Sequence, residues 1–152
     1  MFAAKIERVI DKPIQDVFRL LSDHANYTDY PGVERAELLE EGTNERNGKG
    51  ALRVIGAGPL EFVERITAFE RPFRMDYHIE SAKPFHIEHT KGEIKLIQQG
   101  SGTKVVWETA GYFTLPILGP LFDRLLQATT NEKEKDSYRY SAAWINFHAR
   151  NY

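Results

Sequence analysis

The sequence predicts an α+β fold, in which an antiparallel sheet of about seven strands precedes one long helix near the C-terminus. Turn-forming residues divide the first two-thirds of the chain into short segments with strand-like alternation of apolar and polar residues. A short helical pattern interrupts these segments near the start. From Pro116 onward, apolar residues recur at helical spacing instead.

Residues 2–10 alternate and predict the first strand, and a short helix is expected directly after it. Asp11 can accept hydrogen bonds from the free N–H groups of that helix, and Pro13 suits its first turn because proline lacks an N–H group. A second short helical turn is expected over residues 24–29. The apolar face of the first helix comprises Ile14, Val17, Phe18 and Leu21.

Six further strands are expected before Pro116. Short turn signals separate them, such as Asn-Gly-Lys-Gly at residues 47–50, and short turns imply antiparallel neighbours. The last helix is expected to end near Ile145, and its charged middle, residues 132–136, is either solvated or the site of a bend. No repeat or low-complexity linker interrupts residues 1–152, so a single domain is expected. The six strands are residues 33–41, 51–55, 60–69, 73–80, 85–98 and 103–113.

Composition limits the classes of function. The chain has 152 residues and a net charge of −2 without a basic stripe, so nucleic acid is not an expected partner. It has no cysteine, which excludes disulfides, thiolate metal sites and a cysteine nucleophile. No apolar run approaches the ~20 residues of a membrane-spanning helix, so no stable membrane insertion is expected. Charges near Met1 come too early for a signal peptide, and a cytoplasmic protein is expected.

Several segments resemble motifs of one superfamily, in the same order along the chain. Residues 12–18, Lys-Pro-Ile-Gln-Asp-Val-Phe, resemble its Pro-x-x-x-Val-Phe/Trp segment, and residues 23–31 resemble its Asp-x-x-x-Tyr and Trp-Pro segment. Residues 71–77, Arg-Pro-Phe-Arg-Met-Asp-Tyr, resemble its Pro-x-Arg-Leu-x-Tyr segment. Residues 92–96 and 102–107 resemble its last hairpin. On these motifs the chain resembles the START-like, or SRPBCC, superfamily, which includes polyketide cyclases/dehydrases and lipid-transport proteins.

The resemblance implies a helix-grip fold. In that fold a curved antiparallel sheet wraps around a long C-terminal helix, two short helices lie between the first two strands, and a cavity lies between sheet and helix. It also implies binding or transport of a small hydrophobic ligand, such as a lipid, a quinone or an aromatic polyketide-like compound. The alternatives are a cyclase- or dehydratase-like enzyme and a quinone- or ribosome-associated interaction protein. No cofactor is expected, because Gly-Ala-Gly at residues 56–58 lacks the third glycine and the helix of a dinucleotide site.

Strand alternation predicts which side chains line the cavity. Met75, Tyr77 and Ile79 alternate with polar residues, so these three are expected to face inward. Alternation along the other strands, and the helical spacing of apolar residues after Pro116, indicate the remaining lining residues. The predicted ligand-binding residues are Leu52, Val54, Phe62, Met75, Tyr77, Ile79, Val105, Trp107, Phe122 and Leu125.

Two residues are candidates for acid–base chemistry if the protein is an enzyme. Glu64 shares the inward face of its strand with Phe62 and Ile66, and burial favours the protonated form of an unpaired carboxyl group. The alternatives for Glu64 are exposure through a strand twist, or an ion pair with Arg53 or Arg65.

His89 is the second candidate. Counting back from Ile94 and Leu96 puts His86 and Glu88 inside, whereas a bulge at Gly92 puts Ile87 and His89 inside. No metal site is expected here, because a strand places His86 and His89 on opposite faces.

Overall fold

The computed structural model describes residues 1–114. The predicted C-terminal helix, including Phe122 and Leu125, lies outside the described residues. Among the described residues, no helix is both long and apolar enough to cross a lipid bilayer.

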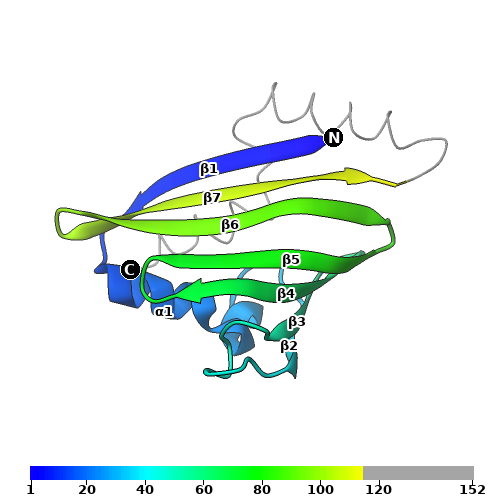
Figure 1. The fold of residues 1–152 in the computed structure, drawn as a ribbon, viewed down its shortest axis with the longest axis horizontal. Helices are drawn as coiled ribbons and strands as arrows, with labels where there is room; N and C mark the ends of the chain where they lie inside the picture. Colours follow the sequence, from blue (N-terminus) through cyan, green and yellow to red (C-terminus); the bar gives the residue numbers. More distant parts are fainter. Residues whose placement is uncertain (115–152) are drawn as a thin grey trace.

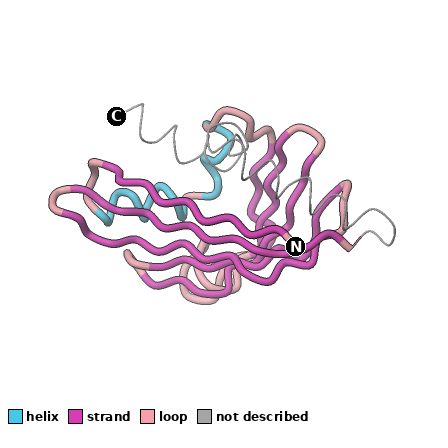
Figure 2. The backbone as a smooth tube through the Cα atoms, turned by 90° about the horizontal axis from the view of Figure 1, so that it is seen from above, coloured by secondary structure: helices cyan, strands magenta, loops and turns pink. Residues whose placement is uncertain are grey.

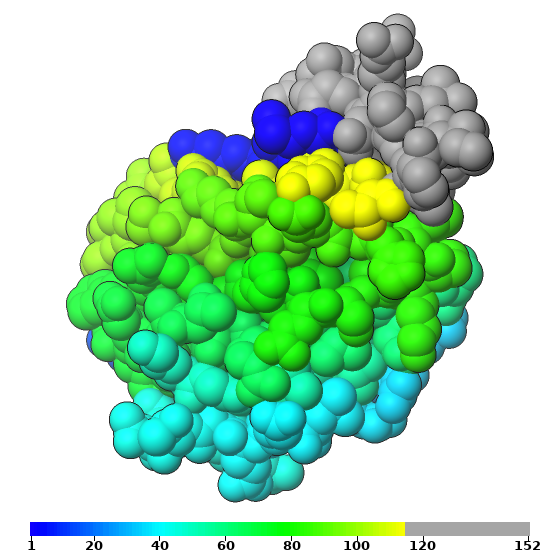
Figure 3. Space-filling model, turned by 45° about the vertical axis from the view of Figure 1, so that its right-hand side comes forward, coloured from blue at the N-terminus to red at the C-terminus, as the bar shows by residue number. Residues whose placement is uncertain are grey.

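The described residues form one seven-stranded antiparallel sheet with two short helices between its first two strands (Figure 1). The strand order is β1-β7-β6-β5-β4-β3-β2, and the bands of Figure 3 follow it from blue through yellow and green to cyan. The elements are β1 (Phe2–Ile10), α1 (Ile14–Ser22), the 3-10 helix η1 (His24–Asp29), β2 (Arg35–Glu40), β3 (Leu52–Ala57), β4 (Leu60–Glu70), β5 (Arg74–Lys83), β6 (Ile87–Gln99) and β7 (Gly102–Phe113).

All seven expected strands and both short helical segments are confirmed. The sheet is strongly curved (Figure 2). Register shifts interrupt the ladders in β2, in β4 and in β6, where the shift lies between His89 and Lys91. An extra residue at such a bulge bends its strand and increases the local twist. The bulges therefore help the sheet to form a concave face.

The start of α1 differs from the expectation. Pro13 is the N-cap residue, no side chain caps the helix, and the N–H groups of Asp16 and Val17 donate to the Pro13 carbonyl oxygen at 3.0 and 3.1 Å. Asp11 does not act as the cap, because a capping side chain must belong to the residue at the cap position to reach the first turn. Its Oδ1 instead accepts a hydrogen bond from the Ser101 hydroxyl at 3.4 Å.

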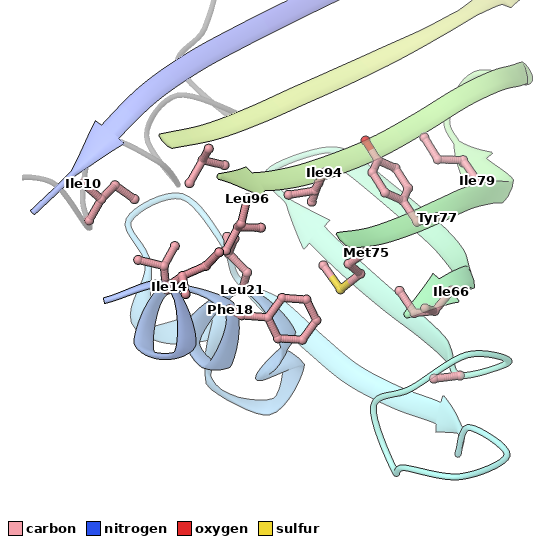
Figure 4. Packing of buried hydrophobic residues seen from close by; sticks show 13 residues of the cluster. Ile10, Ile14, Phe18, Leu21, Ile66, Met75, Tyr77, Ile79, Ile94 and Leu96 are labelled. Atoms are coloured by element: carbon pink, nitrogen blue, oxygen red, sulfur yellow. The ribbon is translucent and has the colours of Figure 1, made fainter. Parts of the chain in front are cut away.

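The packed core lies between α1 and one end of the concave face (Figure 4). Phe18 is only 1% exposed and packs edge-on against Phe69, with ring centroids 5.2 Å apart. Each large apolar side chain buried here stabilises the fold by about 1.5–3 kcal/mol. Along β5, Tyr77 and Ile79 lie farther from α1 than Met75 does. The helix therefore fills one end of the concave face and leaves the other end to the cavity described next.

Candidate functional site

A cavity of about 380 Å³ lies on the concave face beyond the packed core. It is bordered by residues from β1, from the segment that includes η1, and from β3 to β7. Its wall is mainly apolar and rich in aromatic rings, and Arg53 and Glu64 are the charged side chains in its described lining. The rings in the wall include Tyr27, Tyr30, Phe62, Tyr77, Trp107 and Phe113.

Four of the predicted ligand-binding residues line this cavity. They are Phe62, Tyr77, Ile79 and Trp107. The indole Nε1 of Trp107 donates a hydrogen bond to the Tyr77 hydroxyl at 2.8 Å, and the two ring centroids are 6.5 Å apart. Tyr77 and Trp107 therefore border the same cavity, and the two predicted partners of this pair, Phe122 and Leu125, lie outside the described residues.

The other described candidates lie elsewhere. Met75 and Val105 are each 1% exposed and belong to the core beside α1. Leu52 and Val54 are buried, but they alternate along β3 with Arg53, which lines the cavity. The inward parity expected for β3 is therefore reversed: Arg53, Ile55 and Ala57 form its cavity face. The sequence Leu-Arg-Val-Ile-Gly-Ala has apolar residues at both parities, so alternation alone gave the wrong face.

Arg53 and Glu64 form a buried ion pair in the cavity wall. They are direct cross-strand partners on β3 and β4 and are 3% and 8% exposed. The Nε and Nη2 atoms of Arg53 lie 2.9 and 2.7 Å from Oε2 of Glu64. Of the alternatives for Glu64, the pair with Arg53 is the one observed. Arg65 instead pairs with Glu80 and Glu40 on the exposed side of the sheet.

Two tyrosines surround the guanidinium group of Arg53. Its Nη1 donates to the Tyr27 hydroxyl at 3.2 Å, and that hydroxyl donates to the Leu21 carbonyl oxygen. The guanidinium carbon lies 5.3 Å from the ring centroid of Tyr27 and 5.9 Å from that of Tyr77, within the range of cation–π attraction. These contacts fix the position of the cation at the cavity wall.

Burial determines the protonation of both tyrosines. It raises the pKa of Tyr27 to about 12, although the nearby charge of Arg53 opposes the shift. Burial, and then the charge of Glu64, raise the pKa of Tyr77 well above its usual value. Burial by itself would lower the pKa of Arg53, but Tyr27 and Glu64 raise it. The wall therefore presents neutral phenols and one charge-balanced pair near neutral pH.

His89 faces inward, as in the second of the two alternatives, and Ile87 lies on the same side, in the cavity wall. The bulge responsible lies between His89 and Lys91 rather than at Gly92. The Nδ1 atom of His89 accepts the backbone N–H of Ile79 at 3.1 Å, so the proton of the neutral ring is on Nε2 and is donated to Thr109 Oγ1 at 3.1 Å. Burial, together with His78, lowers the pKa of His89 to about 4.

The position of His89 follows from a short ladder between β5 and β6. These strands pair only from Arg74↔Lys95 to Asp76↔Glu93. Beyond Asp76, the Ile79 backbone N–H has no ladder partner on β6 and donates its hydrogen bond to the imidazole of His89 instead. The ring stacks on Tyr77 with centroids 5.3 Å apart. A Cβ atom at Gly92 would lie 2.5 Å from the Tyr77 carbonyl oxygen and 2.7 Å from Cε1 of His89. The close approach therefore requires glycine there.

His24 is a second buried histidine, and sequence reasoning did not single it out. It is 2% exposed and packs edge-on against Tyr27 with centroids 5.4 Å apart. Among the described residues, neither ring nitrogen has a hydrogen-bond partner. Burial, and then the charge of Arg53, lower the pKa of His24 far below its usual value. Within residues 1–114, no group of three or more histidine, aspartate or glutamate residues is placed to hold a metal ion.

Comparisons with known proteins agree with this architecture. A family model described as "polyketide cyclase / dehydrase and lipid transport" matches residues 1–139. No curated protein matches the sequence.

Solved structures resemble the fold at low identity. A START superfamily protein from Mycobacterium smegmatis is 12% identical, with 97% of this chain and 96% of that one covered and a TM-score of 0.69. The Zhui aromatase/cyclase from a Streptomyces species is 19% identical, with 98% and 94% covered and a TM-score of 0.71. A protein from Thermobifida fusca is 22% identical, with 99% and 95% covered and a TM-score of 0.65. At these identities the likeness concerns the fold.

Proposed function

Because the chain belongs to the polyketide cyclase/dehydrase and lipid transport family, we propose that it binds a small hydrophobic molecule in the cavity on the concave face of its sheet. The observation that carries this proposal is the aromatic cavity of about 380 Å³ with the Arg53–Glu64 pair in its wall. Small-molecule sites in proteins typically have volumes of about 300–1,000 Å³, an apolar wall and a few fixed polar groups, and this cavity has all three properties.

The wall favours an aromatic ligand among the candidate classes of lipid, quinone and polyketide-like compound. Aromatic side chains attract other rings through offset-stacked or edge-to-face contacts, which add to the energy of apolar burial. Tyr77 and Trp107 are held in place by their mutual hydrogen bond, so they form a rigid surface for such contacts. An aliphatic lipid chain would gain binding energy from burial of its apolar surface, but it could not form the additional ring–ring contacts.

A second candidate function is proton transfer in a cyclase- or dehydratase-like reaction, because a buried carboxylate faces the cavity. Glu64 would act as the acid–base group, and Arg53 would stabilise its negative charge. His89 is less suited, since both of its ring nitrogens are engaged in hydrogen bonds within the protein. If the protein is such an enzyme, Glu64→Gln should lower turnover by about 10²-fold or more.

Fluorescence provides a direct test of binding. The chain has two tryptophans, so a Trp144→Phe variant reports on Trp107 alone. An apolar dye that enters the cavity should quench Trp107 emission, and a bound aromatic molecule should reverse the effect. Native mass spectrometry of protein from its own host would then show the mass of a carried ligand.

A matched pair of variants locates the binding event. Ile55→Phe adds a ring on the cavity face of β3 and should weaken dye binding at least about tenfold, which corresponds to roughly 1.4 kcal/mol. Ile97→Phe makes the same change at a position that is 52% exposed on β6, and it should leave binding unchanged. Equal binding by both variants, or no quenching of Trp107 at all, would contradict the proposal.

A further inference from the structure

The Glu64 carboxylate leaves one oxygen for a ligand. Both contacts with Arg53 end on the same atom, Oε2. Among the described residues, Oε1 of Glu64 makes no hydrogen bond, and Glu64 lines the cavity. The pair therefore lacks the two-oxygen fork that arginine and carboxylate groups often form. A negatively charged oxygen in an apolar wall is a strong acceptor that favours a donor within reach.

The same wall offers little to an anion. Arg53 is the single cation among the described lining residues, and Glu64 already balances its charge. Two of its N–H groups are directed at Glu64 Oε2 and a third at the Tyr27 hydroxyl, whose own proton is donated to the Leu21 carbonyl oxygen. A ligand carboxylate placed here would meet the charge of Glu64 at close range in a medium of low dielectric constant, where like charges repel strongly.

We infer that this cavity selects a neutral aromatic molecule that carries a hydroxyl group, and that Glu64 Oε1 accepts the hydrogen bond from that hydroxyl. The inference rests on the proposed binding function and adds the chemical class of the ligand. It separates phenols and quinols, which can donate, from quinones, which only accept, and from carboxylates such as fatty acids, which are anionic. Arg53 acts as a positioning residue that holds the Glu64 carboxylate in place through its contacts with Oε2.

Matched naphthalene derivatives test the inference on the native chain by displacement of the cavity dye at pH 7. We expect 2-naphthol, which is neutral and donates, to bind at least tenfold more tightly than 2-naphthoate, and more tightly than unsubstituted naphthalene and 1,4-naphthoquinone. Equal affinities for naphthol and naphthalene, or tighter binding of naphthoate, would overturn the inference while leaving hydrophobic binding intact. If none of the four compounds displaces the dye, the proposed function itself fails.

A charge-removing substitution gives a second, independent test. Glu64→Gln keeps the shape of the side chain and frees the charge of Arg53, so naphthol should lose affinity and naphthoate should gain it, which reverses their order. Glu61→Gln is the control, because Glu61 lies on the same strand but pairs with Arg35 and Lys83 outside the cavity lining. An unchanged order in folded Glu64→Gln protein would overturn the role of Glu64. If that variant does not fold, the ligand series on the native chain still decides the inference.

Discussion

Removal of one member of the buried Arg53–Glu64 pair should destabilise the protein strongly. Arg53→Met replaces the cation by an apolar side chain and leaves the Glu64 carboxylate only 8% exposed without its partner. Breaking a buried ion pair in this way costs about 3–5 kcal/mol, because an uncompensated charge remains in the interior. For a chain of this length, each kcal/mol lowers the melting temperature by about 2–4 °C, so a decrease of roughly 6–20 °C is expected.

The double variant Arg53→Met/Glu64→Leu separates loss of the pair from loss of packing. Removing both charges should restore most of the stability, to within about 2 kcal/mol of the native chain, since replacing a buried pair by apolar groups is often neutral. Urea unfolding at pH 7, followed by circular dichroism, gives the free energy of unfolding of the four proteins in this double-mutant cycle: the native chain, Arg53→Met, Glu64→Leu and the double variant. Arg35→Met breaks a solvent-exposed pair with Glu61 and should therefore lower the stability much less than Arg53→Met does.

Two outcomes of this cycle would refute the reasoning. If Arg53→Met lowered the free energy of unfolding by less than about 1 kcal/mol, the Glu64 carboxylate would be solvated by water or by other polar groups once Arg53 is gone. A double variant as unstable as the sum of the single variants would mean that the two side chains do not interact energetically.

Two further predictions concern the histidines and Gly92. The free energy of unfolding should fall as the pH drops below about 6.5, because the unfolded chain then protonates His24 and His89 while the folded chain keeps both neutral. Each histidine lowers the free energy of unfolding by up to ~1.4 kcal/mol per pH unit. The decrease due to His89 ends near its folded pKa of about 4. His24→Phe should flatten this dependence between pH 5 and 7 in urea titrations, and an unchanged slope would contradict a neutral buried His24. Gly92→Ala should cost about 1–3 kcal/mol in thermal unfolding, since its methyl group would lie 2.5 Å from the Tyr77 carbonyl oxygen, whereas Thr90→Ala, at an exposed neighbour, should be close to neutral.

The strand pattern was predictable because turn residues and alternation agree along most of the sheet. On β5, Asp76, His78 and Glu80 alternate with Met75, Tyr77 and Ile79, and the structure places the second set inside. Period-2 alternation is informative when one face is polar and the other apolar. On β3 both faces carry apolar residues, so the same argument had no basis there.

The orientation of His89 was not predictable from alternation, because one extra residue changes the face of every residue beyond it. The sequence marks the region with Gly92, and the bulge lies two or three residues earlier, between His89 and Lys91. Gly92 has a different role, which is to let the His89 ring lie against the backbone of Tyr77. A glycine within a strand thus indicated a close approach of neighbouring groups rather than the bulge itself.

The Arg53–Glu64 pair, in contrast, was within reach of sequence reasoning through hairpin register. A two-residue turn at Gly58 and Pro59 pairs Ala57 with Leu60, and counting outward from this pair places Arg53 opposite Glu64. Directly opposed residues of antiparallel strands share a face, so an inward Glu64 requires an inward Arg53. Because Leu52 and Val54 alternate with Arg53 along β3, this register also predicts that they point away from the cavity. The length of one turn therefore determines which charge faces the cavity beside Glu64, and with it the polarity available to a ligand.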